Sequence, residues 1–165
     1  MENKPLVGIL MGSDSDLPTM KKAFEVLKEF DVPFEVKIIS AHRNTEIHAE
    51  YMRTAVDRGL KVIIAGAGMA AHLPGVTAAL TPLPVIGVPL TAKVLDGVDA
   101  LHSIVMMPPG VPVATVGIDA AKNAGLLAVQ ILGTSDKSLL EKFVQYKKDM
   151  GEAAYKKNER VAEFL

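Results

Sequence analysis

The segment Phe34-Glu35-Val36-Lys37-Ile38-Ile39-Ser40-Ala41-His42-Arg43 joins a short apolar run, residues 34–39, to a charged, helix-like run, Thr45–Arg58. A strand that leads directly into a helix is the building unit of parallel α/β sheets, which hold their ligands at the carboxyl ends of their strands. The segment therefore predicts an α/β fold and places the imidazole of His42 and the guanidinium of Arg43 at the ligand-binding edge. An acid/base group beside an anion-binding group indicates an enzyme.

The composition fits a single folded domain. The 165 residues are 49% hydrophobic and 22% charged, which allows a sizeable core. The 18 Lys and Arg residues against 19 Asp and Glu residues give a net charge of -1 and no basic stripe, so we expect no nucleic-acid partner. The chain has no cysteine, which excludes disulfide bonds and thiolate metal sites and fits a cytoplasmic location. No apolar stretch approaches the roughly 20 residues that span a bilayer, so we expect neither a signal peptide nor a membrane contact.

Five short apolar runs alternate with helical patterns along the chain. The runs are residues 6–11, 34–39, 62–65, 85–88 and 113–116. Several are apolar on both faces, which is typical of parallel strands covered by helices above and below. Candidate helix N-caps are Asp16, Asn44 and Asp119, the last ahead of an Ala-rich run to Leu132. We predict a three-layer α/β/α sandwich around a five-stranded parallel sheet, similar to flavodoxin-like and Rossmann-like folds.

Residues 135–165 have the pattern of one long helix that follows a core of about 6–132, and we assign 1–165 to one domain. Leu139, Leu140, Phe143, Val144 and Met150 form an apolar stripe on this helix. At about 1.5 Å per residue the helix would be roughly 45 Å long, more than the width of a domain of this size. Two interpretations follow: its far end packs on another subunit, or the helix breaks near Gly151 and frays.

The loop after the first strand, Gly12-Ser13-Asp14-Ser15-Asp16, suits a phosphorylated sugar. Its hydroxyls and backbone N–H groups can bind a phosphate monoester, which Arg43 can also bind with two parallel hydrogen bonds. One of the two carboxylates can then accept hydrogen bonds from sugar hydroxyls. The alternative is a helix cap, in which Asp16 binds the amides of the next turn.

His42 is the candidate general acid and base. A histidine can take up and return a proton near neutral pH, and no other type of side chain at these strand ends does so without a large perturbation. Ser40, Arg43 and the first loop favour catalysis over the alternative of a structural histidine. His48 and His102 fall in helical runs and are predicted to be surface or packing residues.

The loop after the third strand, residues 66–75, formally contains the dinucleotide fingerprint as Gly66-x-Gly68-x-x-Ala71. A Rossmann domain needs an acidic residue at the end of the next strand, and residues 85–90 supply none before Asp96. The small residues instead allow a planar base to lie against the backbone, or a helix to pack closely on the strand. His72 either points at the ligand or caps the next helix.

Several other classes of protein are disfavoured. The chain has no Trp, and its three Tyr residues fall in helical runs, so nothing predicts a flavin contact. A receiver domain needs a carboxylate at the end of the third strand, where this chain has Gly and Ala. No metal-ligand spacing, Gly-x-Ser-x-Gly elbow or Gly-Lys-Ser/Thr phosphate loop is present. We therefore expect neither a cofactor nor a metal, and a non-catalytic nucleotide-binding module on the same fold stays open.

Four motifs resemble those of the bacterial N5-carboxyaminoimidazole ribonucleotide mutases, over residues 7–132. They are Met11-Gly12-Ser13-Asp14-Ser15-Asp16, Ser40-Ala41-His42-Arg43, Ala65-Gly66-Ala67-Gly68 with 70–75, and Pro84-Val85-Ile86-Gly87-Val88-Pro89. The related animal-type enzyme carboxylates aminoimidazole ribonucleotide directly with CO2 and typically has lysine after the histidine. Arg43 and Gly66-Ala67-Gly68 resemble the mutases instead. Met69, where the family more often has glycine, and Met106, where glutamine is frequent, depart from the pattern.

The resemblance implies a step of purine biosynthesis in which the carboxylate on the exocyclic nitrogen moves to ring carbon C4, through aminoimidazole ribonucleotide and trapped CO2. It implies that His42 moves the proton between C4 and the carboxylate, that Ser13 and Arg43 hold phosphate, and that Asp16 holds the ribose. The remaining candidate substrate-binding residues are Ser40, His72 and the imidazole-binding backbone of Gly66, Ala67 and Gly68. It also implies homo-octamers with exchanged C-terminal helices. Because trapped CO2 needs a closed pocket, we expect the stiff segment 106–112 to act as a lid.

Overall fold

The computed structural model describes residues 4–164 and contains one parallel five-stranded sheet. The strands are β1 Val7–Met11, β2 Phe34–Ile38, β3 Val62–Gly68, β4 Val85–Leu90 and β5 Ala114–Thr115. They are arranged in the order β2-β1-β3-β4-β5 and every neighbouring pair is parallel. The predicted sheet is confirmed, and its carboxyl ends all lie at one edge.

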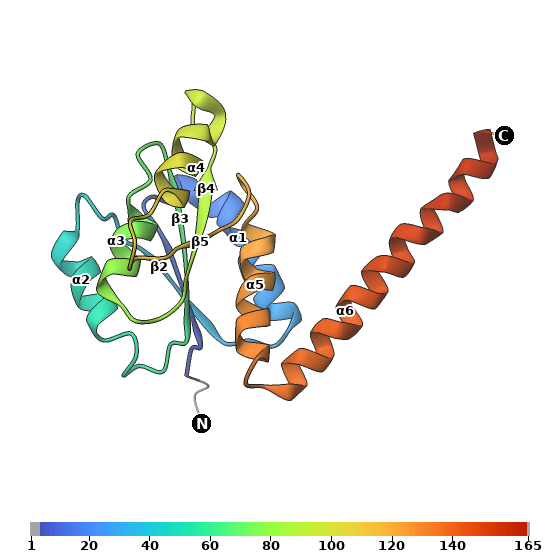
Figure 1. Ribbon diagram of the computed structural model, residues 1–165, viewed down its shortest axis with the longest axis horizontal. Helices are drawn as coiled ribbons and strands as arrows, with labels where there is room; N and C mark the ends of the chain where they lie inside the picture. The colour runs from blue at the N-terminus through green and yellow to red at the C-terminus, as the bar shows by residue number, and fades with distance from the viewer. Residues whose placement is uncertain (1–3, 165) are drawn as a thin grey trace.

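Helices cover both faces of the sheet (Figure 1). They are α1 Leu17–Glu29, α2 Thr45–Arg53, α3 Leu73–Leu80, α4 Val98–Val105, α5 Ala121–Gly133 and α6 Lys137–Lys156, with short 3-10 turns at Asp14–Asp16, Leu95–Gly97 and Lys157–Phe164. Helices α1 and α5 lie side by side on one face, and α2, α3 and α4 cover the other. This is the predicted three-layer α/β/α sandwich.

The two faces of the sheet carry separate apolar clusters. Ile9 and Ile64 pack with α1 and α5, whereas the adjacent residues Leu10 and Ile63 pack with the helices of the other face. Successive side chains of a strand point to opposite faces, so a strand that is buried on both sides must be apolar throughout. All five residues of β1 are buried, which explains why this run showed no alternation of polarity.

Some predicted helix boundaries are wrong. The helix expected over Thr45–Arg58 ends at Arg53, and hydrogen-bonded turns carry the chain from there to Gly59. Asp119 does not cap α5, whose N-cap is Ala120. The Asp119 carboxylate instead accepts hydrogen bonds from the backbone N and Oγ1 of Thr91, at 3.0 and 2.6 Å, and so ties the end of β4 to the start of α5.

The C-terminal helix α6 runs unbroken through Gly151, so of the two interpretations the one with a break near that residue is wrong. Asp136 caps the helix by accepting hydrogen bonds from the backbone N–H groups of Ser138 and Leu139. Figure 1 shows α6 extending away from the sheet, and beyond its buried first turns it is largely exposed. Neither α6 nor any other helix within residues 4–164 is long and apolar enough to cross a membrane.

Candidate functional site

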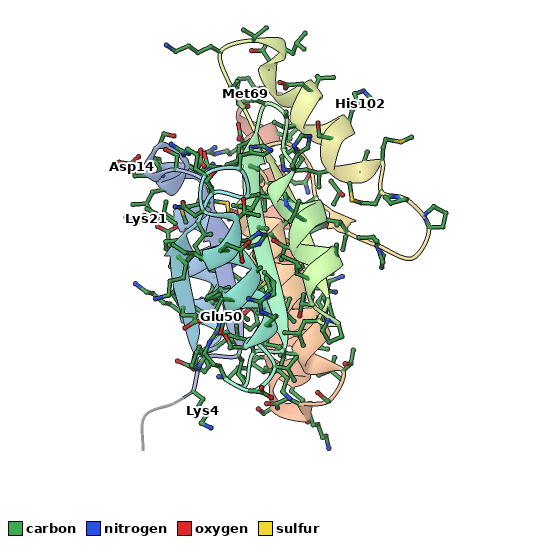
Figure 2. All side chains as sticks on the ribbon, turned by 90° about the vertical axis from the view of Figure 1, so that its left-hand side faces the viewer. Lys4, Asp14, Lys21, Glu50, Met69 and His102 are labelled. Carbon is green, nitrogen blue, oxygen red and sulfur yellow. The ribbon has the colours of Figure 1, made fainter. Side chains whose placement is uncertain are left out.

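A cavity of about 950 Å³ lies at the carboxyl edge of the sheet. In Figure 2 Asp14 and Met69 mark this edge, and Lys4 marks the opposite one. The loops after β1, β2, β3 and β4 all contribute to the cavity wall. Of the predicted site residues, those that line it are Ser13, Asp16, Ser40, His42, Arg43, Ala67, Gly68 and His72.

In the first loop, Ser13 and Asp16 form a reciprocal cap on the 3-10 turn. The Oγ of Ser13 accepts from the backbone N–H of Ser15 at 3.3 Å, and the carboxylate of Asp16 accepts from the backbone N–H of Ser13 at 3.1 Å. Asp16 makes no side-chain hydrogen bond to the first turn of α1, so the expected alternative of a cap on that helix is wrong. Burial raises the pKa of the Asp16 carboxyl, although hydrogen bonds from Ser13 and Ser15 act in the opposite direction.

In the second loop, a tight turn presents His42 and Arg43 to the cavity. The backbone N–H of Asn44 donates to the carbonyl of Ser40 at 2.9 Å, and the backbone N–H of Arg43 donates to the Ser40 hydroxyl at 3.3 Å. The guanidinium of Arg43 reaches the first loop, where Nη2 donates to the carbonyl of Gly12 at 2.9 Å. Arg43 and Ser13 also line an adjoining hollow of about 480 Å³. The guanidinium of Arg43, the hydroxyl of Ser13 and the backbone of Gly12 thus lie at the same end of the site.

His42 and His72 meet across the cavity wall. Nε2 of His42 lies 2.7 Å from Nδ1 of His72, and the two rings stand nearly perpendicular with their centroids 4.9 Å apart. Both side chains are exposed to the cavity side of the molecule. Because one nitrogen must donate and the other accept, the two rings share one proton along this contact. His72 therefore holds the orientation of the candidate acid and base.

In the third loop, Gly66 faces the helix packed on the sheet, whereas the residues that follow it line the cavity. Gly66 does not line the cavity: a Cβ there would overlap the Sδ of Met20, a fully buried residue of α1. The alternative of close helix-to-strand packing thus accounts for Gly66, whereas Ala67 and Gly68 line the cavity. Met69 occupies a position where the family that the chain resembles more often has glycine. Its φ is 58°, a left-handed conformation that favours glycine.

The cavity wall that follows β4 was not predicted from the sequence. Thr91, Ala92, Lys93 and Val94 line the cavity, as does Asp99 in the first turn of α4. The signal was present, because the carboxyl-edge rule applies to the fourth strand as it does to the first three. Segment 106–112, the expected lid, does not line the cavity in this chain, because α4 carries the chain away from this edge before the segment begins.

The cavity can bind an anion at one end and hold a planar group against small residues. A histidine between these two parts can transfer a proton to or from the bound ligand. Arg43 and Ser13 supply the anion-binding groups, the backbone at Ala67 and Gly68 supplies the flat wall, and His42 supplies the proton. No group of three or more residues that could hold a metal ion occurs in the described part of the chain, residues 4–164.

Known proteins are similar to this chain in sequence and in fold. Residues 6–153, which include every loop of the cavity, match the family model described as AIR carboxylase. The N5-carboxyaminoimidazole ribonucleotide mutase of Synechocystis sp. is 66% identical over 88% of this chain and 83% of that protein. The phosphoribosylaminoimidazole carboxylase of Saccharomyces cerevisiae is 63% identical over 87% of this chain but only 25% of that protein. A crystal structure of Treponema denticola PurE matches with a TM-score of 0.86 and 30% identity, over 95% of this chain and 98% of that chain.

Proposed function

The chain belongs to the AIR carboxylase family, and we propose that it catalyses the conversion of N5-carboxyaminoimidazole ribonucleotide to 4-carboxy-5-aminoimidazole ribonucleotide in purine biosynthesis. The 66% identity to a protein named as a mutase of the first compound supports this reaction. The observation that carries the proposal is the 2.7 Å contact between His42 and His72 in a cavity that also holds Arg43. This contact supports an oriented acid/base group in the same cavity as a cation that can bind phosphate.

Substrate binding follows from the wall of the cavity. The hydroxyl of Ser13 and the guanidinium of Arg43 bind the phosphate, since a charge-assisted pair of donors suits a phosphate monoester. Asp16 accepts hydrogen bonds from the ribose hydroxyls. Ser40 holds the turn that carries Arg43, because its hydroxyl accepts from the backbone N–H of Arg43. The imidazole lies against Ala67 and Gly68, where the absence of large side chains leaves room for a flat ring.

The reaction then needs a single acid/base group. His42 donates a proton to the carbamate, whose N5–C bond breaks to release CO2 and leave the proton on N5. Ring carbon C4 attacks the trapped CO2, a new C4–C bond forms, and the proton of C4 returns to His42. One proton has moved from C4 to N5 and the histidine is restored, so atoms and charge balance. A general acid and base of this kind contributes about 10²- to 10⁴-fold to the rate.

We also propose that this protein forms a homo-oligomer, an octamer with exchanged C-terminal helices, in the cytoplasm. The support is the exposed apolar side of α6 and of the turn that follows it. Leu140, Val144 and Met150 are each at least half exposed, and Phe164 is 86% exposed, so this side has no partner of its own within residues 4–164. A second copy that covered it would remove this apolar area from water.

The alternative is a carboxylase that uses aminoimidazole ribonucleotide and CO2 directly, and the yeast relative is the observation that favours it. The identity of the carboxyl donor separates the two. We expect rapid product formation from N5-carboxyaminoimidazole ribonucleotide, and slow formation from aminoimidazole ribonucleotide with low bicarbonate. A reaction without enzyme corrects for spontaneous loss of CO2 from the carbamate. Efficient turnover at low bicarbonate would replace the mutase assignment with the carboxylase.

A further inference from the structure

The end of the cavity beyond β4 carries a second cation. Of the described residues that line the cavity, Arg43 and Lys93 are the two with Lys or Arg side chains. Arg43 follows β2 and Lys93 follows β4, and the sheet order β2-β1-β3-β4 puts three strand spacings between them. At about 4.8 Å per spacing the two cations arise about 14 Å apart along the sheet edge. They stand at opposite ends of one cavity.

Lys93 has no counter-charge within the described residues. Its side chain is exposed, and no carboxylate whose side chain the structure describes lies within ion-pair distance of its ammonium group. Asp99 lines the same cavity without pairing with Lys93, and Oδ1 of Asp99 has no hydrogen-bond partner in the part of the chain that the structure describes. The Lys93 charge is thus available to a ligand.

The loop that carries Lys93 is anchored on both sides. On one side, Thr91 is held by its two hydrogen bonds to Asp119. On the other, Leu95, Asp96 and Gly97 all have positive φ, at 62°, 48° and 85°, and turn the chain into α4. A branched aliphatic residue in this conformation is unusual and costs energy. In Figure 1 the loop lies above the edge of the sheet, between β4 and α4.

We propose that Lys93 binds the migrating carboxylate of the substrate, an inference that rests on the proposed function. The substrate has two anionic groups, a phosphate and a carboxylate, with the ribose and the imidazole between them. Arg43 accounts for the phosphate at one end, and Lys93 is the complementary cation at the other. N5 is bonded to C5, the ring neighbour of C4, so the two carboxylate positions are close together. The flexible stem of one lysine and its three N–H donors therefore reach the carboxylate both before and after transfer.

Two ligands that differ only in the carboxylate test this role. Aminoimidazole ribonucleotide has the phosphate and no carboxylate, whereas the 4-carboxy product has both. We expect Lys93→Met to weaken binding of the 4-carboxy product by about tenfold or more, since a hydrogen bond between charged groups is lost. Binding of aminoimidazole ribonucleotide should change by no more than about twofold, because no carboxylate is involved. Titration calorimetry of the whole protein measures both, and Lys93→Arg should restore most of the product affinity.

Lys61→Met is the matched control, since Lys61 is exposed and precedes β3 at the opposite edge of the sheet. It should leave both affinities unchanged. Equal weakening of both ligands by Lys93→Met would assign Lys93 to the shape of the loop, and unchanged product affinity would remove it from the site; either result overturns the proposal. Failure of the proposed function looks different: the wild-type protein would bind both ligands and not convert the N5-carboxylated substrate.

Discussion

Nε2 of His48 lies 2.9 Å from Oγ1 of Thr77, and this buried contact joins α2 to α3. The Thr77 hydroxyl donates its own proton to the carbonyl of Leu73 at 2.7 Å, so it accepts from Nε2–H of His48. Nδ1 of His48 is then unprotonated, and it has no hydrogen-bond partner among residues 4–164. Because α2 follows the loop of His42 and α3 follows His72, this contact joins the helices that follow the two histidines of the candidate site.

Stability should decrease in mild acid because of His48. Burial lowers the pKa of its imidazole, since protonation of Nδ1 would place an unpaired charge in the interior. The unfolded chain, with an ordinary histidine pKa of about 6.5, therefore binds more protons than the folded chain once the pH falls into that range. We expect the free energy of unfolding to fall as the pH drops through about 6.5, and to keep falling until the lower folded-state pKa is passed. Urea unfolding at a series of pH values measures this slope.

Two variants test whether His48 causes this pH dependence of the free energy of unfolding. His48→Gln keeps an N–H donor for Thr77 and removes the titrating ring, so the slope should become shallower. His102→Asn, at an exposed position of α4, should leave it unchanged. If His48→Gln kept the full wild-type slope, the dependence would belong to other groups.

Gly66→Ala should destabilise the fold. The new Cβ would overlap the sulfur of Met20, which is fully buried and must repack between α1 and the sheet, at a cost of about 1–3 kcal/mol. Gly151→Ala is the control with the opposite sign, because nothing lies within 4 Å of the added methyl group and alanine favours a helix by about 0.5–1 kcal/mol. Denaturant unfolding compares them. Normal stability together with weakened binding of aminoimidazole ribonucleotide would instead give Gly66 a direct role in holding the imidazole.

His72→Asn should lower kcat with little change in KM. Loss of the 2.7 Å contact leaves the His42 ring free to rotate, and misplacing a catalytic group by about 1 Å can reduce the rate about a hundredfold. Arg43 and Ser13, the proposed phosphate-binding residues, are unchanged, so we expect substrate affinity to be retained. Steady-state kinetics gives the two constants, and the melting temperature shows whether the fold is intact. A rise in KM at constant kcat would make His72 a binding residue alone.

Most of the fold could be predicted because the residues that determine it are local. Strand β1 is apolar at all five positions, and this pattern alone indicates a strand covered on both faces. The errors arise where tertiary contacts decide. Asp119 has the local features of an N-cap, but Thr91, 28 residues away, binds its carboxylate. Gly151 lowers helix propensity, yet one glycine does not end a 20-residue helix with a strong N-cap at Asp136.

The candidate site could be predicted as a set of loops, but not as a set of contacts. The sequence placed His42 and His72 at the same edge of the sheet, in the loops after the second and third strands. It did not give their 2.7 Å approach, which depends on how α2 and α3 pack through His48 and Thr77. Nor could spacing show that Gly66 faces Met20, because the alternation of a strand gives the face of the sheet but not the helix residue that packs on it.

The central claim is that His42 moves the proton, and His42→Asn tests it most directly. Asparagine keeps a polar side chain of similar reach but cannot act as a general acid or base near neutral pH. We predict that this variant binds aminoimidazole ribonucleotide with near wild-type affinity by calorimetry, while turnover of N5-carboxyaminoimidazole ribonucleotide falls by about 10² or more. Turnover at the wild-type rate would contradict the account.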